Sequence, residues 1–318
     1  MSPHALRPRG RNGVVLIASS CVARGGRTRG TGVPPVGLMG ETPMLRDHHM
    51  PHAKGIFSYF GYELPLWRRL ALLARAGVTH TSLWWGPPEE EFRLGRIHDA
   101  PGLARSFGLH VENLHVPFEA CNDLWLGPGE RDHFARRHMA WIDDARRHGI
   151  ATVVMHVSHT DAAPNPTPAG LATFDAVARH ALEAGVTLAV ENTRRDDILH
   201  AVLDACPLDS VAFCYDSSHD WLWGQPRWST LTRWAARLRQ THFSDVDPAT
   251  ARDRHRLPGH GNLDWPALAA RFPRDYRGAL MLEVMPADLA DTPPETFLTK
   301  CVRALHWLEE ILPGERGT

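Results

Sequence analysis

The chain has 318 residues, of which 43% are hydrophobic and 22% are charged, and its formal net charge is −1. This composition is typical of a soluble globular protein, and no segment approaches the roughly 18 consecutive apolar residues of a membrane span. Seven arginines and two acidic residues give residues 1–52 a net charge of +5, so the remainder carries −6. A mildly acidic body does not offer the broad positive surface of a protein that grips duplex DNA, although a local basic patch is compatible with it.

The five cysteines are odd in number and show no Cys-x-x-Cys spacing. This pattern argues against a disulfide framework and against a cysteine zinc knuckle. It favours a reducing compartment, and we therefore expect a cytoplasmic protein that has no membrane partner.

The first 52 residues are rich in Arg, Gly and Pro and contain one short apolar stretch, Val14 to Ile17. We expect a disordered N-terminal extension or a start site placed too far upstream, since Met44 and Met50 both precede the first credible strand. A signal peptide is the alternative, because a basic start precedes the segment VVLIASSCVA. Its apolar core is short and its Ala-x-Ala cleavage site is poor.

Strand-like and helix-like segments alternate from Lys54 to the end of the chain. The expected strands are short apolar runs rich in β-branched residues, and they cover residues 55–60, 78–85, 109–116, 151–157, 186–191, 211–216, 238–245 and 278–284. A helical segment follows each strand, and four of these segments end in a glycine such as Gly77 just before the next strand, as short connections prefer. Eight such units are what a (β/α)₈ TIM barrel requires, so we expect an α/β fold with one barrel domain over residues 53–314.

Six of the expected strands end on a residue type that binds metal ions. These residues are His115, His156, Glu191, Asp216, His242 and Glu283. A single histidine at a strand end usually packs or faces solvent, but a closed barrel brings the carboxyl ends of all its strands to one mouth. The sequence therefore predicts a metal site at that mouth. Three carboxylates together with the imidazole of His242 suit Mn²⁺, Mg²⁺, Co²⁺ or Zn²⁺.

Five short motifs carry a family resemblance. They are VENT with Glu191, YDSSH with Asp216 and His219, HFSD with His242, DRHRLPGHGNLDW with Asp253 and His255, and LEV with Glu283. Residues from about 54 to 312 resemble the xylose isomerase-like TIM-barrel superfamily, which unites sugar isomerases and epimerases with endonuclease IV. Each motif alone is weak evidence for this superfamily, whereas the five motifs together are specific for it. The chain has no P-loop, no Gly-x-Ser-x-Gly elbow and no Rossmann fingerprint.

In the isomerase and epimerase branch, the resemblance implies one divalent metal ion held by Glu191, Asp216, His242 and Glu283. It also implies that Glu191 and Glu283 are the catalytic acid/base pair, which moves a proton on a metal-bound enediolate. His219 and Arg256 are then expected to contact the substrate. We accordingly expect an isomerase or epimerase whose partner is a small sugar, sugar acid or polyol.

In the endonuclease IV branch, the resemblance implies a cluster of up to three Zn²⁺ ions. The same four residues take part, His115 and His156 serve a second ion, and a third ion is held by His219, Asp253 and His255. This chain has a ligand-competent residue at every position, so a zinc phosphodiesterase that cuts abasic DNA is the alternative function, and only then is nucleic acid a partner.

Plainer interpretations of these residues stay open. Next to a single metal ion, His115 and His156 are oxygen-binding histidines, and Asp253 belongs to an ion-paired loop. A lyase or dehydratase on the same scaffold, or a barrel that only binds a ligand, is a third hypothesis, because one fold hosts many chemistries.

Five tryptophans fall at or just beyond expected strand ends, and they are Trp84, Trp85, Trp125, Trp221 and Trp223. Indole rings pack against the apolar faces of sugars and against unstacked bases. We expect Trp85, Trp125 and Trp221 to contact the substrate, with plain packing as the alternative.

Three other histidines are expected to have no functional role. His133, His138 and His148 belong to the segment 131–149, which also carries several arginines. We expect this helix to turn all three toward solvent.

Overall fold

The computed structural model describes residues 52–86, 97–247, 249–250, 252–289 and 291–313. The chain divides into two units, Met1–Leu45 and Arg46–Thr318, and all described residues belong to the second. The expected N-terminal extension over residues 1–52 therefore lies outside the described residues, apart from His52, and so does the alternative of a signal peptide. None of the described helices is long and apolar enough to cross a membrane.

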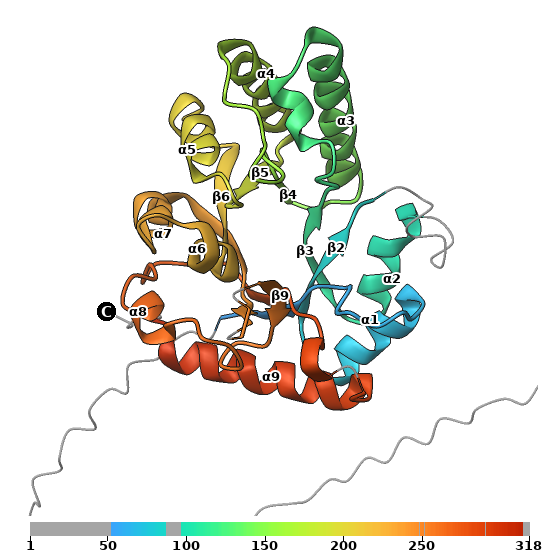
Figure 1. Ribbon diagram of the computed structural model, residues 1–318. Coiled ribbons are helices and arrows are strands. Elements are labelled where there is room, and N and C mark those ends of the chain that lie inside the picture. Colours follow the sequence, from blue (N-terminus) through green and yellow to red (C-terminus); the bar gives the residue numbers. More distant parts are fainter. Residues whose placement is uncertain (1–51, 87–96, 248, 251, 290, 314–318) are drawn as a thin grey trace, which may run out of the picture. The chain divides into compact units, whose positions relative to one another are not determined.

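Eight parallel strands form one sheet that closes on itself (Figure 1). They are β1 (Lys54–Ile56), β2 (His80–Trp84), β3 (His110–His115), β4 (Thr152–Met155), β5 (Thr187–Glu191), β6 (Val211–Asp216), β7 (Leu238–His242) and β10 (Leu280–Leu282), in the spatial order β10-β1-β2-β3-β4-β5-β6-β7. Just beyond β7, Phe243 pairs with Leu282, and its N–H donates to the carbonyl of Met281 at 2.8 Å. This pairing joins the two outer strands, and the expected (β/α)₈ TIM barrel is confirmed.

Helices surround the strands (Figure 1). They are α1 (Leu66–Arg75), α2 (Ala100–Ser106), α3 (Pro128–Arg147), α4 (Pro168–Ala184), α5 (Asp196–Ala205), α6 (Ser217–Trp223), α7 (Ser229–Trp234), α8 (Trp265–Ala269) and α9 (Pro294–Ile311). The glycines that follow α1 to α4 have φ angles of 84°, 78°, 64° and 69°, which L side chains rarely adopt. Each of these four helices therefore ends where only glycine turns the chain cheaply into the next strand.

The core lies inside the barrel and between the barrel and the helices. β4 and β6 are buried along their whole length, because helices cover the outer face of a parallel barrel while side chains fill its interior. On α1, the buried leucines Leu66, Leu70 and Leu73 recur at the spacing of one helix face. Burial of each such side chain contributes about 1.5–3 kcal/mol to stability.

One structural element was not expected from the sequence. β8 (Asp245–Val246) and β9 (Asp253–Arg256) form a two-stranded antiparallel sheet in the connection after β7. The segment DRHR has no apolar alternation, so strand propensity does not reveal it. Its position is instead fixed by Asp245, a buried carboxylate that accepts hydrogen bonds from the N–H groups of Gly259 and Leu263 and from the indole of Trp265.

The expectation for His138 on α3 was wrong. Its side chain is only 2% exposed, its ring stacks on Phe134 with centroids 3.8 Å apart, and Nδ1 donates to the Phe134 carbonyl at 2.8 Å. His133 is exposed as expected, and His148 is half-buried. The many arginines of this segment led to the prediction of a solvent-facing helix, whereas His138 lies on the side of α3 that packs against the core.

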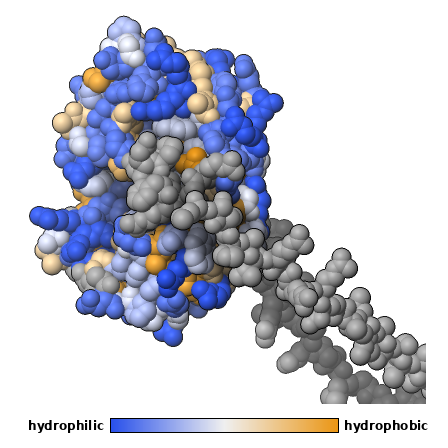
Figure 2. Space-filling view, turned by 90° about the vertical axis from the view of Figure 1, so that its right-hand side faces the viewer, coloured by the Kyte–Doolittle hydropathy of each residue, from blue (hydrophilic) through white to orange (hydrophobic). Residues whose placement is uncertain are grey.

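Figure 2 shows a face whose described residues are mostly hydrophilic, with small and separate hydrophobic spots. Scattered apolar residues of this kind are normal on a protein surface and need no partner. The features that call for a functional explanation are therefore the buried polar side chains at the mouth of the barrel.

Candidate active site and metal centre

The six strand-end residues meet at the carboxyl mouth of the barrel. His115, Glu191, Asp216 and His242 are the last residues of β3, β5, β6 and β7, while His156 and Glu283 directly follow β4 and β10. Parallel strands in a closed barrel point their carboxyl ends to the same side, so residues up to 168 positions apart in the sequence come together.

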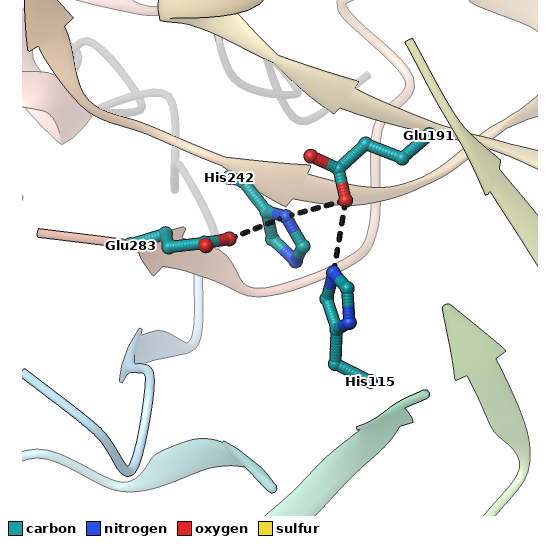
Figure 3. Close-up of side chains that lie close together, drawn as sticks. All are labelled: His115, Glu191, His242 and Glu283. Atoms are coloured by element: carbon teal, nitrogen blue, oxygen red, sulfur yellow. Dashed lines mark hydrogen bonds and ion pairs between the residues drawn. The ribbon is translucent and has the colours of Figure 1, made fainter. Parts of the chain in front are cut away.

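The centre of the cluster is the imidazole of His242 (Figure 3). Its Nδ1 atom lies 2.8 Å from Glu283 Oε2 and 3.1 Å from Glu191 Oε2. On the other side of Glu191, His115 Nε2 lies 3.2 Å from the same carboxylate oxygen. One ligand atom from each of these four residues lies within 4.8 Å of all the others.

Several atoms of this cluster are buried without a hydrogen bond among the described residues. They are both ring nitrogens of His242, Glu283 Oε2 and Asp216 Oδ2. Most buried polar atoms in proteins are hydrogen-bonded, because leaving one unpaired costs about 1–3 kcal/mol. A divalent cation could accept these lone pairs, so the donor atoms suit a metal ion, although the four-residue group within 4.8 Å contains His115 in place of the predicted Asp216.

Asp216 joins the cluster from β6 and is held in place by α6. Its Oδ1 atom accepts hydrogen bonds at 2.8 Å from the Ser218 hydroxyl and from the N–H of His219, so that the carboxylate caps the helix. The second oxygen, Oδ2, is left for another partner. Glu191, Asp216 and His219 also form a group whose ligand atoms lie within 4.8 Å of one another.

The electrostatics of the centre favour ionised glutamates. Burial opposes the charge of Glu191, but the neighbouring His242 and His156 hold its pKa well below the usual range. Burial likewise opposes ionisation of Glu283, and His242 lowers its pKa to about 2. The pKa of Asp216 is raised by burial and by the nearby Glu191 carboxylate, although His219 opposes this rise. Three carboxylates crowded in a buried site require positive charge beside them, which the neighbouring histidines supply and a bound cation could also supply.

A second group surrounds Glu191. His115 Nε2 and His156 Nε2 both lie 3.2 Å from Glu191 Oε2. His115 Nδ1 lies 3.1 Å from the carbonyl of Val116, which accepts only from an N–H. The other nitrogen of that ring therefore turns toward the carboxylate, and a cation or a proton must lie between them.

A third group lies beside α6, where β9 supplies Asp253 and His255. His219 Nε2 and His255 Nε2 lie 3.1 Å and 3.4 Å from Asp253 Oδ2. Both rings donate through Nδ1 to backbone carbonyls, those of Asn192 at 2.9 Å and Glu283 at 3.2 Å. Because Nδ1 of each ring is a donor, loss of the proton on Nε2 would present both Nε2 lone pairs to the same point, as in metal-ligating histidines.

A cavity of about 700 Å³ opens onto all three groups. Its wall combines the ligand-type residues with aromatic and charged side chains, which include Phe57, Tyr59, Tyr62, Trp84, Phe118, Trp223, Glu119 and Arg194. This volume falls within the range of about 300–1,000 Å³ that is usual for small-molecule sites. His242 and Asp216 are fully buried beneath it.

Trp85 and Trp125 are packing residues, which corrects the expectation that they contact the substrate. Trp85 is 2% exposed and donates to Asp144 Oδ2 on α3 at 3.0 Å. Trp125 is 3% exposed and donates to the carbonyl of Val157 at 2.7 Å. Neither lines the cavity.

Trp221 and Arg256 are also absent from the cavity lining. The indole of Trp221 stacks under the guanidinium of Arg227 at 4.0 Å. Arg256 lies 3.5 Å from Asp247, next to the β8–β9 sheet. The cavity lining gives no support to the expected substrate contacts of Trp221 and Arg256, which stay predictions.

Trp84 and Trp223 are the tryptophans that do line the cavity. Trp84 pairs in register with His115 and stacks on its ring, with centroids 5.6 Å apart. Cross-strand partners point to the same face of a sheet. Register with the ligand histidine is therefore the signal that would have selected Trp84 over its neighbour Trp85.

Known proteins share this architecture. The family model described as "Xylose isomerase-like TIM barrel" matches residues 70–305. A protein from Sinorhizobium fredii (strain NBRC 101917 / NGR234) called "Uncharacterized protein y4fM" is 31% identical to this chain over 292 residues. The matched region covers 80% of this chain and 92% of that protein.

Two solved structures show the likeness of the fold. A xylose isomerase-like TIM barrel/4-hydroxyphenylpyruvate dioxygenase fusion protein has a TM-score of 0.67 at 18% identity, covering 82% of this chain, which spans only 43% of that longer protein. D-psicose 3-epimerase from Clostridium cellulolyticum H10 has a TM-score of 0.63 at 15% identity, covering 83% of this chain and 100% of its own. The family model matches well over half of the length of this chain. This chain therefore belongs to the xylose isomerase-like TIM barrel family.

Proposed function

We propose that residues 53–314 form a divalent-metal-dependent isomerase or epimerase that acts on a sugar, a sugar acid or a related polyol. The observation that carries this proposal is the position of Glu191 and Glu283 around His242 at the floor of a small-molecule cavity. The likeness of the fold to D-psicose 3-epimerase is consistent with it. The described cysteines are free and buried, in keeping with the reducing cytoplasm that we propose as the compartment.

In this proposal, Glu191, Asp216, His242 and Glu283 hold the metal ion. A bound divalent cation would supply positive charge beside the carbonyl and hydroxyl oxygens of the substrate, where negative charge develops when a neighbouring C–H proton is removed. The orphaned atoms of His242, Asp216 and Glu283 support this assignment.

The two glutamates are the proposed acid/base pair. They project from β5 and β10 and lie on different sides of the His242 ring (Figure 3). The pKa of both carboxyl groups is lowered, which favours the carboxylate form that a general base requires. A base on each side of one carbon permits epimerisation, while transfer to the neighbouring carbon gives an aldose–ketose isomerisation.

The aromatic wall serves to bind the substrate and to exclude water. Phe118 stacks on His156 with centroids 4.9 Å apart, and Phe57 lies edge-on to His115 and His242. The apolar face of a sugar ring packs well on such a surface. A dry site also strengthens the electrostatic interactions at the reacting carbon.

Solvent exchange tests this proposal. Metal-loaded protein is incubated in D₂O with a panel of ketoses and aldoses, and deuterium at the carbon next to the carbonyl is measured by NMR. We expect incorporation that requires both the metal ion and Glu283. An absence of deuterium from every member of a broad panel would contradict the proposed proton transfer.

A zinc phosphodiesterase that acts on abasic DNA is the second candidate. It is favoured by the two further ligand groups, His115 and His156 around Glu191, and His219 and His255 around Asp253. Metal content and nicking distinguish the candidates. About three zinc ions at the carboxyl mouth together with cleavage of abasic duplex would establish the nuclease, while a single ion there without cleavage leaves the isomerase.

A further inference from the structure

A separate cluster of ligand-type side chains lies at the opposite end of the barrel. His80 and His110 are the first residues of β2 and β3, and Glu112 follows two positions later on β3. His80 pairs in register with His110, and their rings lie side by side with centroids 4.8 Å apart. The amino ends of parallel strands form the face away from the proposed active site, so the cluster is independent of that site.

The donor atoms of this cluster surround one point. Glu112 Oε2 lies 3.9 Å from His80 Nε2 and 3.7 Å from His110 Nε2, and the three ligand atoms lie within 4.8 Å of one another. Metal–ligand bonds of about 2.0–2.2 Å place the ligands of one tetrahedral ion roughly 3.4 Å apart. Small rotations of the Glu112 carboxylate and of His110, whose side chain is 63% exposed, would close these differences.

The contacts of His80 are compatible with the tautomer that binds metal through Nε2. The Thr79 hydroxyl donates to the carbonyl of Lys54 at 3.3 Å, and it lies 2.9 Å from His80 Nδ1. A hydroxyl that gives its one proton to the Lys54 carbonyl accepts from an N–H at His80 Nδ1. In that tautomer the lone pair of Nε2 faces Glu112.

Glu112 is held in position from across the barrel. Its Oε1 atom accepts from Gln240 Nε2 at 3.1 Å, and Gln240 Oε1 in turn accepts from Asn113 Nδ2 at 3.0 Å. Gln240 belongs to β7, four strands away from β3 in a sheet of eight, so these bonds cross the interior. Outer partners of this kind orient a carboxylate ligand, and here they leave Oε2 for the two imidazoles.

We propose that His80, His110 and Glu112 form a binding site for a divalent transition-metal ion of the Zn²⁺ class. Two imidazole nitrogens and one carboxylate oxygen suit Zn²⁺, Ni²⁺ or Cu²⁺ better than Mg²⁺ or Ca²⁺, which prefer oxygen ligands. The exposure of His110 leaves room for water as the fourth ligand. An ion at this point links the first residues of β2 and β3. It stabilises the folded barrel more as the occupancy of the site rises.

Calorimetric titration of the chelator-stripped full chain with ZnCl₂ tests this site. We expect the wild type to bind one more Zn²⁺ per chain than His110→Ala. Glu112→Gln should weaken this one site at least about 100-fold, since losing an outer partner alone costs 10–100-fold. His133→Ala removes an exposed histidine of α3 and should titrate as the wild type does.

The two variants keep the test decisive if one of them fails to fold, which circular dichroism will show. Equal numbers of Zn²⁺ ions with unchanged affinities in the wild type, His110→Ala and Glu112→Gln would overturn the proposal. Isomerase activity has no part in this test, so the result stands whatever chemistry the carboxyl mouth performs.

Discussion

At the scale of single residues, His242 supplies positive charge at the centre of the cluster. Its Nδ1 atom lies within 3.1 Å of two carboxylates. Burial opposes protonation of this ring, but Cys214 and the carboxylates of Glu191 and Glu283 hold its pKa well above the usual value, and a bound metal ion would take the place of the ring proton. Removal of one partner from such a buried group is strongly destabilising unless the group itself becomes neutral.

Glu283→Gln should abolish turnover while leaving the barrel folded. The amide keeps the shape of the side chain but cannot accept the substrate proton, and loss of a general base costs about 10²–10⁴-fold in rate. The rate is measured by deuterium exchange and the fold by circular dichroism. Glu119→Gln, in the same cavity wall, is the control, and its exchange rate should fall by less than about tenfold. Retained activity in Glu283→Gln would show that the acid/base assignment is wrong.

His138 should make the protein sensitive to acid. Burial lowers its pKa from 6.5 to about 3, although the Phe134 carbonyl opposes this shift. Below pH 6.5, His138 is therefore protonated in the unfolded chain but stays neutral in the folded chain. The free energy of unfolding falls as the pH drops from 6.5 toward 3. The expected loss is about 1.4 kcal/mol per pH unit between about pH 6 and pH 4.

Urea unfolding at several pH values measures this slope. In His138→Leu, the slope of the unfolding free energy against pH should be smaller by the equivalent of about one proton. The group that titrates differently in the folded and unfolded states is then absent. His133→Leu, on the exposed side of the same helix, should keep the slope of the wild type. Equal slopes in all three proteins would contradict the account of His138.

At the scale of elements, the β8–β9 sheet carries Asp253 and His255 to the site, and Asp245 holds that sheet in place. Asp245 Oδ1 accepts from the N–H groups of Val246 and Leu263, and Oδ2 accepts from Gly259 N–H and the Trp265 indole, all between 2.9 and 3.0 Å. His255 also has a φ of 45°, a conformation that the surrounding contacts must maintain.

Asp245→Ala should lower the free energy of unfolding by at least about 3 kcal/mol. It leaves four donors without their acceptor, and each unpaired buried group costs about 1–3 kcal/mol. Asp264→Ala, which removes only the cap of α8, should cost about 1 kcal/mol. Hydrogen exchange over residues 253–263 should speed up in the first variant alone; unchanged exchange there would show that Asp245 does not position the loop.

The strands that end on ligands could be predicted from the sequence, while the finer parts of the site could not. Short apolar runs that end in His, Asp or Glu, such as the one before Glu191, define both the barrel and its mouth because both strand faces are buried. The choice between Trp84 and Trp85 depends on register, and the register shifts between Thr81 and Ser82, where β3 has one extra residue, Glu112. The β8–β9 sheet depends on tertiary hydrogen bonds that leave no periodic signal.

At the scale of the whole molecule, the barrel gathers distant residues into a charged centre. The four proposed ligands come from β5, β6, β7 and β10, so a metal ion bound there would connect half of the barrel strands. Binding to the folded state alone adds about 2.7 kcal/mol of stability when the free ion is at 100 times its Kd.

Chelation should therefore lower the melting temperature, and Mn²⁺ should restore it. Mn²⁺ is the suitable probe because its preference for oxygen ligands favours the carboxyl mouth over the two histidines at the amino end. His242→Ala should show no recovery with Mn²⁺, whereas His110→Ala should recover as the wild type does. A melting temperature that does not respond to chelation would contradict the linkage.

The most direct measurement is the anomalous scattering of crystals grown with Mn²⁺. We predict one strong anomalous peak at the carboxyl mouth, within about 2.5 Å of oxygens of Glu191, Asp216 and Glu283 and of a ring nitrogen of His242. No peak among these four side chains at saturating Mn²⁺, or a peak that only one of them contacts, would contradict the shared metal ion on which the proposed chemistry depends.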